Sequence, residues 1–198
     1  MADKIYRALA DAVKVLLEMP DGTHAERAAV LYAGGQRPVV DAHTHIHRGQ
    51  MFTADYDVAA LANNASIDII LTTPADDYPH LNINAGIGGD GLLYVYQDAV
   101  FTGGTPLTIV NHKFTSTNTA DEVLLHTPTV SDVGANKITH YIPGGTGGIS
   151  VGGVGGRSEE LILKPSTNYL IRLTNVSGQA RRASIDMKWY QSVDIPDA

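Results

Sequence analysis

The sequence has no cysteine among its 198 residues, which excludes disulfide bonds and thiolate metal sites. Aromatic bulk is also scarce: three Phe and one Trp stand against twenty Gly and nine Pro, and this balance indicates many turns around a modestly packed core. The net charge is −7, so the sequence does not supply the basic surface that nucleic-acid binding needs. No apolar run approaches the ~18 residues of a membrane span. We therefore expect neither a nucleic-acid nor a membrane partner.

The first part of the chain predicts a helical arm over residues 1–36. A Pro-Asp-Gly sequence at residues 20–22 ends its first helix, and acidic residues among the apolar ones make it unlike a signal peptide. Apolar residues recur there every three to four positions, which places them on one stripe of a helix. The stripe is a candidate docking surface for a partner, and it consists of Ile5, Leu9, Val13 and Leu16.

Residues 37–198 predict a single β-domain. Short apolar or alternating runs recur between Gly- and Pro-containing turns, and no crossover helices separate them. A glycine-rich segment at residues 144–156 lacks the Lys-Ser/Thr of a phosphate-binding loop and predicts a plain loop. The fold class that follows is mainly β, an antiparallel β-sandwich of jelly-roll type with an N-terminal helical arm. The predicted strands are residues 39–47, 66–73, 80–84, 92–97, 107–112, 121–125, 137–142, 159–163, 167–175 and 183–191.

Two runs near the C-terminus alternate with the period of a half-buried strand. They flank a turn at Ser177 and Gly178, so we predict that they form an antiparallel pair with one buried face. The predicted core residues on that face are Tyr169, Ile171, Leu173, Ile185, Met187 and Trp189.

Three alternating histidines, His43, His45 and His47, are the clearest candidate metal ligands. An apolar run that ends in His-x-His resembles the first metal-binding strand of the amidohydrolase superfamily, and a strand would place all three rings on one face. That family's barrel needs ~250 residues, however, and alternate strand residues lie ~6.5–7 Å apart, too wide to converge easily on one ion. We predict no catalytic metal and no cofactor, with a structural ion on a symmetry axis as the alternative.

Tyrosines offer a candidate glycan-binding surface, because aromatic faces stack on sugar rings. Tyr94 and Tyr96 share one face of a predicted strand, where sheet packing is the competing explanation. The wider candidate set adds Tyr56, Tyr78 and Tyr141.

Six blocks of sequence together resemble a family of tailed-bacteriophage virion proteins similar to trimeric jelly-roll decoration, or cement, proteins. The blocks are residues 45–54, 88–97, 111–118, 126–130, 141–148 and 163–180. The resemblance implies a homotrimer on the outer surface of the capsid, bound to the major capsid protein, and it brings no catalytic residues. The arm lies outside these blocks, and we expect its apolar stripe to dock on the capsid because an exposed helical stripe suits a partner's groove. The alternatives are a glycan-binding module of a fibre or tail and, third, a metal-dependent hydrolase built on the histidine strand.

Overall fold

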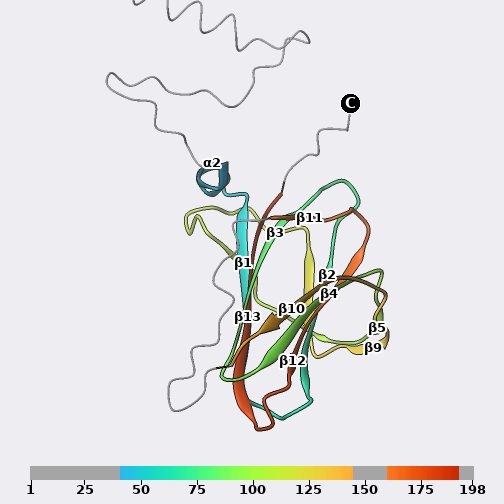
Figure 1. Cartoon of the computed structure of the whole chain (residues 1–198). Coiled ribbons are helices and arrows are strands. Elements are labelled where there is room, and N and C mark those ends of the chain that lie inside the picture. Colours follow the sequence, from blue (N-terminus) through green and yellow to red (C-terminus); the bar gives the residue numbers. More distant parts are fainter. Residues whose placement is uncertain (1–40, 145–159, 192–198) are drawn as a thin grey trace, which may run out of the picture. The chain divides into compact units, whose positions relative to one another are not determined.

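Residues 41–144 and 160–191 are described by the computed structural model, in which one helix precedes thirteen strands (Figure 1). The predicted arm, with its stripe of Ile5, Leu9, Val13 and Leu16, lies outside these ranges. The elements are α2 (Asp41–Arg48), β1 (Met51–Leu61), β2 (Ser66–Thr72), β3 (His80–Ile87), β4 (Gly91–Gln97), β5 (Val100–Thr102), β6 (Thr105–Pro106), β7 (Val110–Asn111), β8 (Val123–His126), β9 (Thr129–Asp132), β10 (Ala135–Ile142), β11 (Leu161–Ile162), β12 (Asn168–Asn175) and β13 (Arg181–Tyr190).

The strands form two main antiparallel sheets and one small ribbon, which confirms the mainly β prediction. The five-stranded sheet has the order β11-β3-β13-β1-β7, and the six-stranded sheet has the order β10-β4-β12-β2-β8-β6. The ribbon pairs β5 with β9. Their inner faces supply a shared core, as in a β-sandwich.

The pairing of the eight principal strands is nested, as in a rolled-up hairpin. Strand β1 pairs with β13, β2 with β12, β3 with β11, and β4 with β10. The first strand thus meets the last, the second meets the second-last, and so on inward, while the strands alternate between the sheets. This arrangement is consistent with the predicted jelly roll.

An insertion between β4 and β10 extends the sheets at their edges. Within it, β7 pairs with the start of β1, and β8 pairs with β2 and in turn with β6. A small apolar cluster of Ile70, Ala99 and Leu170, with Phe101 of β5 and Val130 of β9 packed against it, lies apart from the main core. The ribbon therefore covers a second apolar area, which keeps Ile70 and Leu170 fully buried.

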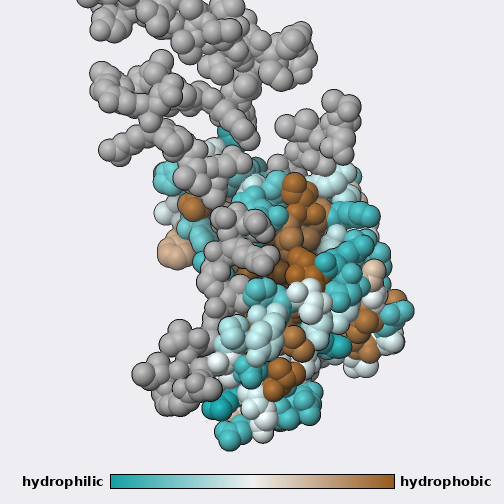
Figure 2. Space-filling view, in the orientation of Figure 1, coloured by the Kyte–Doolittle hydropathy of each residue, from teal (hydrophilic) through white to brown (hydrophobic). Residues whose placement is uncertain are grey.

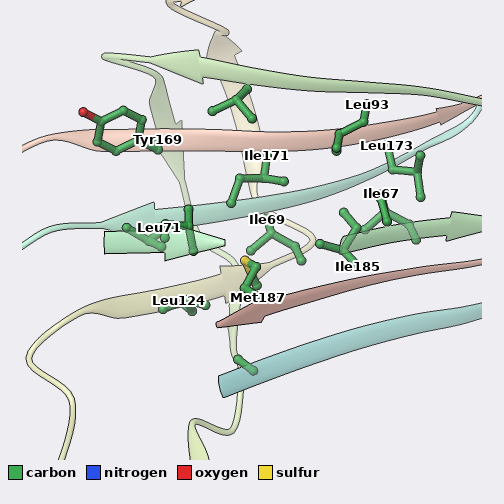
Figure 3. Packing of buried hydrophobic residues seen from close by; sticks show 14 of the residues in the cluster. Ile67, Ile69, Leu71, Leu93, Leu124, Tyr169, Ile171, Leu173, Ile185 and Met187 are labelled. Atoms are coloured by element: carbon green, nitrogen blue, oxygen red, sulfur yellow. The ribbon is translucent and has the colours of Figure 1, made fainter. Parts of the chain in front are cut away.

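The main core lies between the inner faces of the two sheets. Ile185 and Met187 of β13 face Ile67 and Ile69 of β2 across the sandwich, with Leu124 beside them (Figure 3). All six residues that the alternation assigned to the core are buried: Tyr169, Ile171, Leu173, Ile185, Met187 and Trp189.

The predicted pairing of the two C-terminal strands is wrong. Strand β12 pairs with β2 and β4 in one sheet, and β13 pairs with β1 and β3 in the other. The mostly exposed connection passes from one sheet to the other as an arch that Asn175 holds in place. Its buried Nδ2 donates to Leu61 O and Gln179 O, both at 2.7 Å, and its Oδ1 accepts from Ser177 N at 3.0 Å.

Two further strand predictions also differ from the structure. Of the predicted strand 39–47, the described residues 41–47 are not a strand, because they belong to the helix α2, Asp41–Arg48. Residues 107–112 contain only the two-residue β7. The predicted strands also omit the long β1, although its buried residues alternate and include Phe52 and Ala54. Asp55 and Asp57, which follow Ala54 along the strand, are exposed on the outer face of β1.

Candidate interaction site around helix α2

The end of helix α2 is set by glycine geometry. Gly49 has a φ of 69°, in the left-handed region that L side chains rarely adopt, and its N–H donates to Ile46 O at 3.0 Å. Gln50 N then donates to His45 O at 2.9 Å. The chain leaves the helix here and enters β1, so Gly49 fixes how α2 joins the sheet.

A surface loop, residues 111–118, donates hydrogen bonds to the remaining carbonyls at this end of α2. Lys113 Nζ donates to His47 O at 2.9 Å, and Asn118 Nδ2 reaches Arg48 O at 3.3 Å and Gly49 O at 3.2 Å. Asn111 Nδ2 also donates to Gly49 O, at 2.8 Å. Side chains from a distant segment therefore provide the helix C-cap, since the last carbonyls of a helix have no partners within it.

The loop that caps α2 presents Phe114 to solvent, and 88% of the Phe114 surface is exposed. Among the described residues, Phe114 is the most exposed of the large hydrophobic side chains. The hydrogen bonds of Lys113 and Asn118 hold the loop on both sides of Phe114. This arrangement suits an anchor residue that inserts into a pocket of a partner.

The three candidate metal ligands do not share one face, because the segment is helical. His43 and His47 are four residues apart on the exposed side of α2, and their Nε2 atoms are 3.0 Å apart. His45 instead stacks on Tyr190 at 4.1 Å between ring centroids, and its Nδ1 is buried without a hydrogen-bond partner. The structure thus separates His45 from the other two.

Tyr190 connects His45 to a second polar group. Its hydroxyl donates to Glu160 Oε2 at 2.7 Å and lies 2.9 Å from His80 Nδ1, and the His80 ring also stacks on it. His80 Nδ1 and Glu160 Oε2 are themselves 3.3 Å apart. No local pattern in the sequence predicts this cluster, because Glu160 and Tyr190 are 30 positions apart.

No group of three or more His, Asp or Glu side chains that could hold a metal ion occurs within residues 41–144 and 160–191. Catalytic zinc in proteins ordinarily has three protein ligands, together with an open position. The described residues therefore offer no support for the hydrolase alternative.

The candidate glycan surface is only partly assembled. Tyr94 and Tyr96 do share the outer face of the six-stranded sheet, stacked at 5.6 Å, and burial raises the pKa of the Tyr96 hydroxyl. Beside them Arg172, directly opposite Tyr94, is paired with Asp68. Tyr56 lies elsewhere: it is on the inner face of the other sheet, stacked on His126 at 4.3 Å.

The remaining exposed apolar side chains lie mainly on short or edge strands. Figure 2 shows a mostly hydrophilic face with a hydrophobic area near β11, whose Ile162 is 57% exposed. Tyr141 on β10 is also exposed. The Gly144 N–H and the Tyr141 hydroxyl donate to Asp90 Oδ1 at 2.6 and 2.8 Å, and these two hydrogen bonds lower the pKa of that carboxyl. In the part of the chain that is described, no helix is long and apolar enough to cross a membrane.

Comparison with known proteins adds no relative. No protein-family model matches the chain, and a search of curated proteins finds no match.

Proposed function

We propose that the chain is a structural protein of a tailed-bacteriophage virion, which decorates the outer surface of the capsid as a homotrimer bound to the major capsid protein. Its task would be mechanical: a trimer that bridges neighbouring capsid subunits adds buried surface and so opposes the pressure of packaged DNA. A contact of ordinary size buries ~1,600 Å². Three equivalent contacts would reinforce one another through high effective concentration.

The observation that carries this proposal is that two of the sequence blocks that resemble the virion family contact each other through hydrogen bonds. Residues 45–54 include the end of α2 and the start of β1, and residues 111–118 form the loop that caps α2. His47 and Lys113 lie 66 positions apart, and the hydrogen bond from Lys113 Nζ to His47 O joins the two blocks. A family-like segment that presents the exposed Phe114 supports a role in docking better than a role in the core.

The edges of the sheets support assembly into an oligomer. Strand β7 pairs with β1 only at Phe52 and Thr53, so the rest of the eleven-residue β1 has no paired neighbour on that side among the described residues. Exposed strand edges favour association with another chain. A closed trimer would have a mass of about 63 kDa, three times the 21.1 kDa of one chain.

The test is binding to capsids that lack this protein. The full chain should sediment with such capsids, and imaged particles should show it at three-fold or quasi-three-fold positions. Phe114→Ser should weaken binding at least tenfold, whereas Val176→Ser, a change at another exposed apolar residue, should not. Light scattering should give the trimer mass. A stable monomer at micromolar concentration, or no capsid binding, would overturn the proposal.

The role of the arm is tested with the same capsid-binding measurement. Removal of residues 1–36 should leave a folded β-domain by circular dichroism, because β1 to β13 pair without those residues. Capsid binding should fall if the stripe of Ile5, Leu9, Val13 and Leu16 docks on the capsid. An unfolded truncated chain would mean that the arm belongs to the core.

Glycan binding is a second candidate, favoured by Tyr94, Tyr96 and Arg172 on one outer face. Aromatic rings beside a guanidinium and a carboxylate match the chemistry of sugar rings and their hydroxyls. Binding to a glycan array that is lost in Tyr94→Ala would support a fibre or tail module. Absence of binding to any glycan would remove this candidate.

A further inference from the structure

The exposed side of α2 carries two imidazoles in the geometry of a chelate. His43 and His47 are one helical turn apart, where side chains at i and i+4 lie on the same face. Their Nε2 atoms are 3.0 Å apart, and the ring centroids are 4.5 Å apart at an interplanar angle of 76°. The short nitrogen distance relative to the ring spacing means that the two Nε2 atoms are turned towards each other.

In the structure the two Nε2 atoms share a hydrogen bond, and a metal ion could take the place of its proton at nearly the same nitrogen distance. With metal–nitrogen bonds of ~2.0–2.1 Å, two ligands 3.0 Å apart subtend about 90–97° at the ion. This is the angle between neighbouring positions of square-planar, tetragonal or octahedral coordination, which Cu²⁺ and Ni²⁺ prefer. A tetrahedral zinc angle would need the nitrogens to open by a few tenths of an ångström, to about 3.3 Å.

We propose that His43 and His47 form a two-histidine site for a divalent transition-metal ion of the Cu²⁺ and Ni²⁺ class, with water completing the coordination. The helix overturns the sequence argument against metal here, because that argument assumed the wide spacing of a strand. Both side chains are exposed, so ion and water can reach them. His45 is not a ligand of this site, since its ring is stacked on Tyr190.

The site would be structural and not catalytic. Two protein ligands leave most positions to water, and no third His, Asp or Glu joins the pair among the described residues. A bound ion would connect consecutive turns of α2 within its described span, Asp41–Arg48. The nearby Lys113 ammonium repels any divalent cation, so only an ion with strong bonds to imidazole would offset that repulsion.

The test uses the full chain without a histidine tag, above the ordinary imidazole pKa of about 6.5. Titration calorimetry with CuCl₂ and with NiCl₂ should show saturable uptake of one ion per chain. The His43→Gln/His47→Gln variant should bind at least tenfold more weakly, because Gln is a poor ligand for these ions. His140→Gln, a matched change on β10, should bind like the unmodified chain.

Electron paramagnetic resonance of the Cu²⁺-loaded chain gives a second measurement that does not depend on a variant. It should show two equatorial nitrogens. Absence of saturable uptake, a loss below tenfold in the double variant, or a signal without two nitrogens would each overturn the proposal. The inference does not rest on the capsid function, so either can fail without the other.

Discussion

Arg172 on β12 donates two hydrogen bonds of 2.6 Å, from Nε and Nη2, to the two carboxylate oxygens of Asp68 directly opposite on β2. The hydrogen bonds to Asp68 raise the pKa of the Arg172 guanidinium, which is charged in any case. Both side chains are partly shielded, with 26% and 17% of their surfaces exposed. A bidentate pair in this setting fixes both partners and holds β12 in register with β2.

Arg172→Met should lower the free energy of unfolding by about 1.5–3 kcal/mol, because it leaves the shielded Asp68 carboxylate without its charged partner. The pair of Arg182 and Asp57 is the matched control, since 74% and 49% of those side chains are exposed. Arg182→Met should cost less than about 1 kcal/mol. Urea unfolding measures both free energies. Equal losses in the two variants would contradict the role of Arg172 in holding β12 in register with β2.

Trp189→Ala should cost about 3–5 kcal/mol, because it opens a cavity at the largest fully buried side chain. The ring lies 6.0 Å from the ring of Phe52, which would lose its neighbour. Trp189→Phe keeps part of the volume and should cost less. A loss below about 1 kcal/mol in urea unfolding would mean that Trp189 is not part of a packed core.

Glu122→Gln should stabilise the protein at neutral pH. Burial raises the pKa of the Glu122 carboxyl, and the Trp189 indole beside it offsets only part of that rise, since neither Nε1 nor Oε1 makes a well-aligned hydrogen bond. A raised folded-state pKa means that the folded state binds the proton more tightly. Stability from this group is therefore full below the ordinary pKa of 4.5 and is lost as pH rises through the raised value.

Thermal unfolding at two pH values checks this prediction. The Gln variant should melt higher at pH 7, by about 2–4 °C for each kcal/mol recovered, and the difference should vanish below the ordinary carboxyl pKa. Asp121→Asn, at the exposed neighbouring position, should not show this pattern. An equal gain at both pH values would assign the effect to something other than ionisation.

Asn118→Ala should loosen the end of α2, because it removes the amide that donates to Arg48 O and Gly49 O. Hydrogen exchange should become faster in residues 43–50, and the free energy of unfolding should fall by about 1 kcal/mol. Asn136→Ala, which loses only a surface hydrogen bond to Thr139, is the control. Unchanged exchange in α2 would show that the loop does not cap the helix.

The sequence was sufficient for the fold class and for the buried faces of the strands, because period-two alternation directly reports which side of a strand meets the core. It could not assign strand partners. Tyr169 and Ile185 flank a short turn, yet their strands belong to opposite sheets, and only long-range packing decides between an arch and a hairpin.

The candidate site was harder to predict for the same reason. His43, His45 and His47 fit a strand and a helix equally well by spacing, and the cap that favours the helix comes from Lys113 and Asn118, far along the chain. The Tyr190 cluster likewise joins residues that have no local pattern in common.

The order β3-β13-β1 has a consequence for synthesis of the protein on the ribosome. The strand that joins β1 to β3 is the last of the described strands to be translated, and Thr53 meets Asp186 across 133 positions. Both neighbours must therefore wait with unpaired edges until the C-terminal segment emerges, at roughly 5–20 residues per second. During that interval the nascent chain exposes apolar strands to other nascent chains. The yield of native protein should thus depend on how quickly the final strand is released.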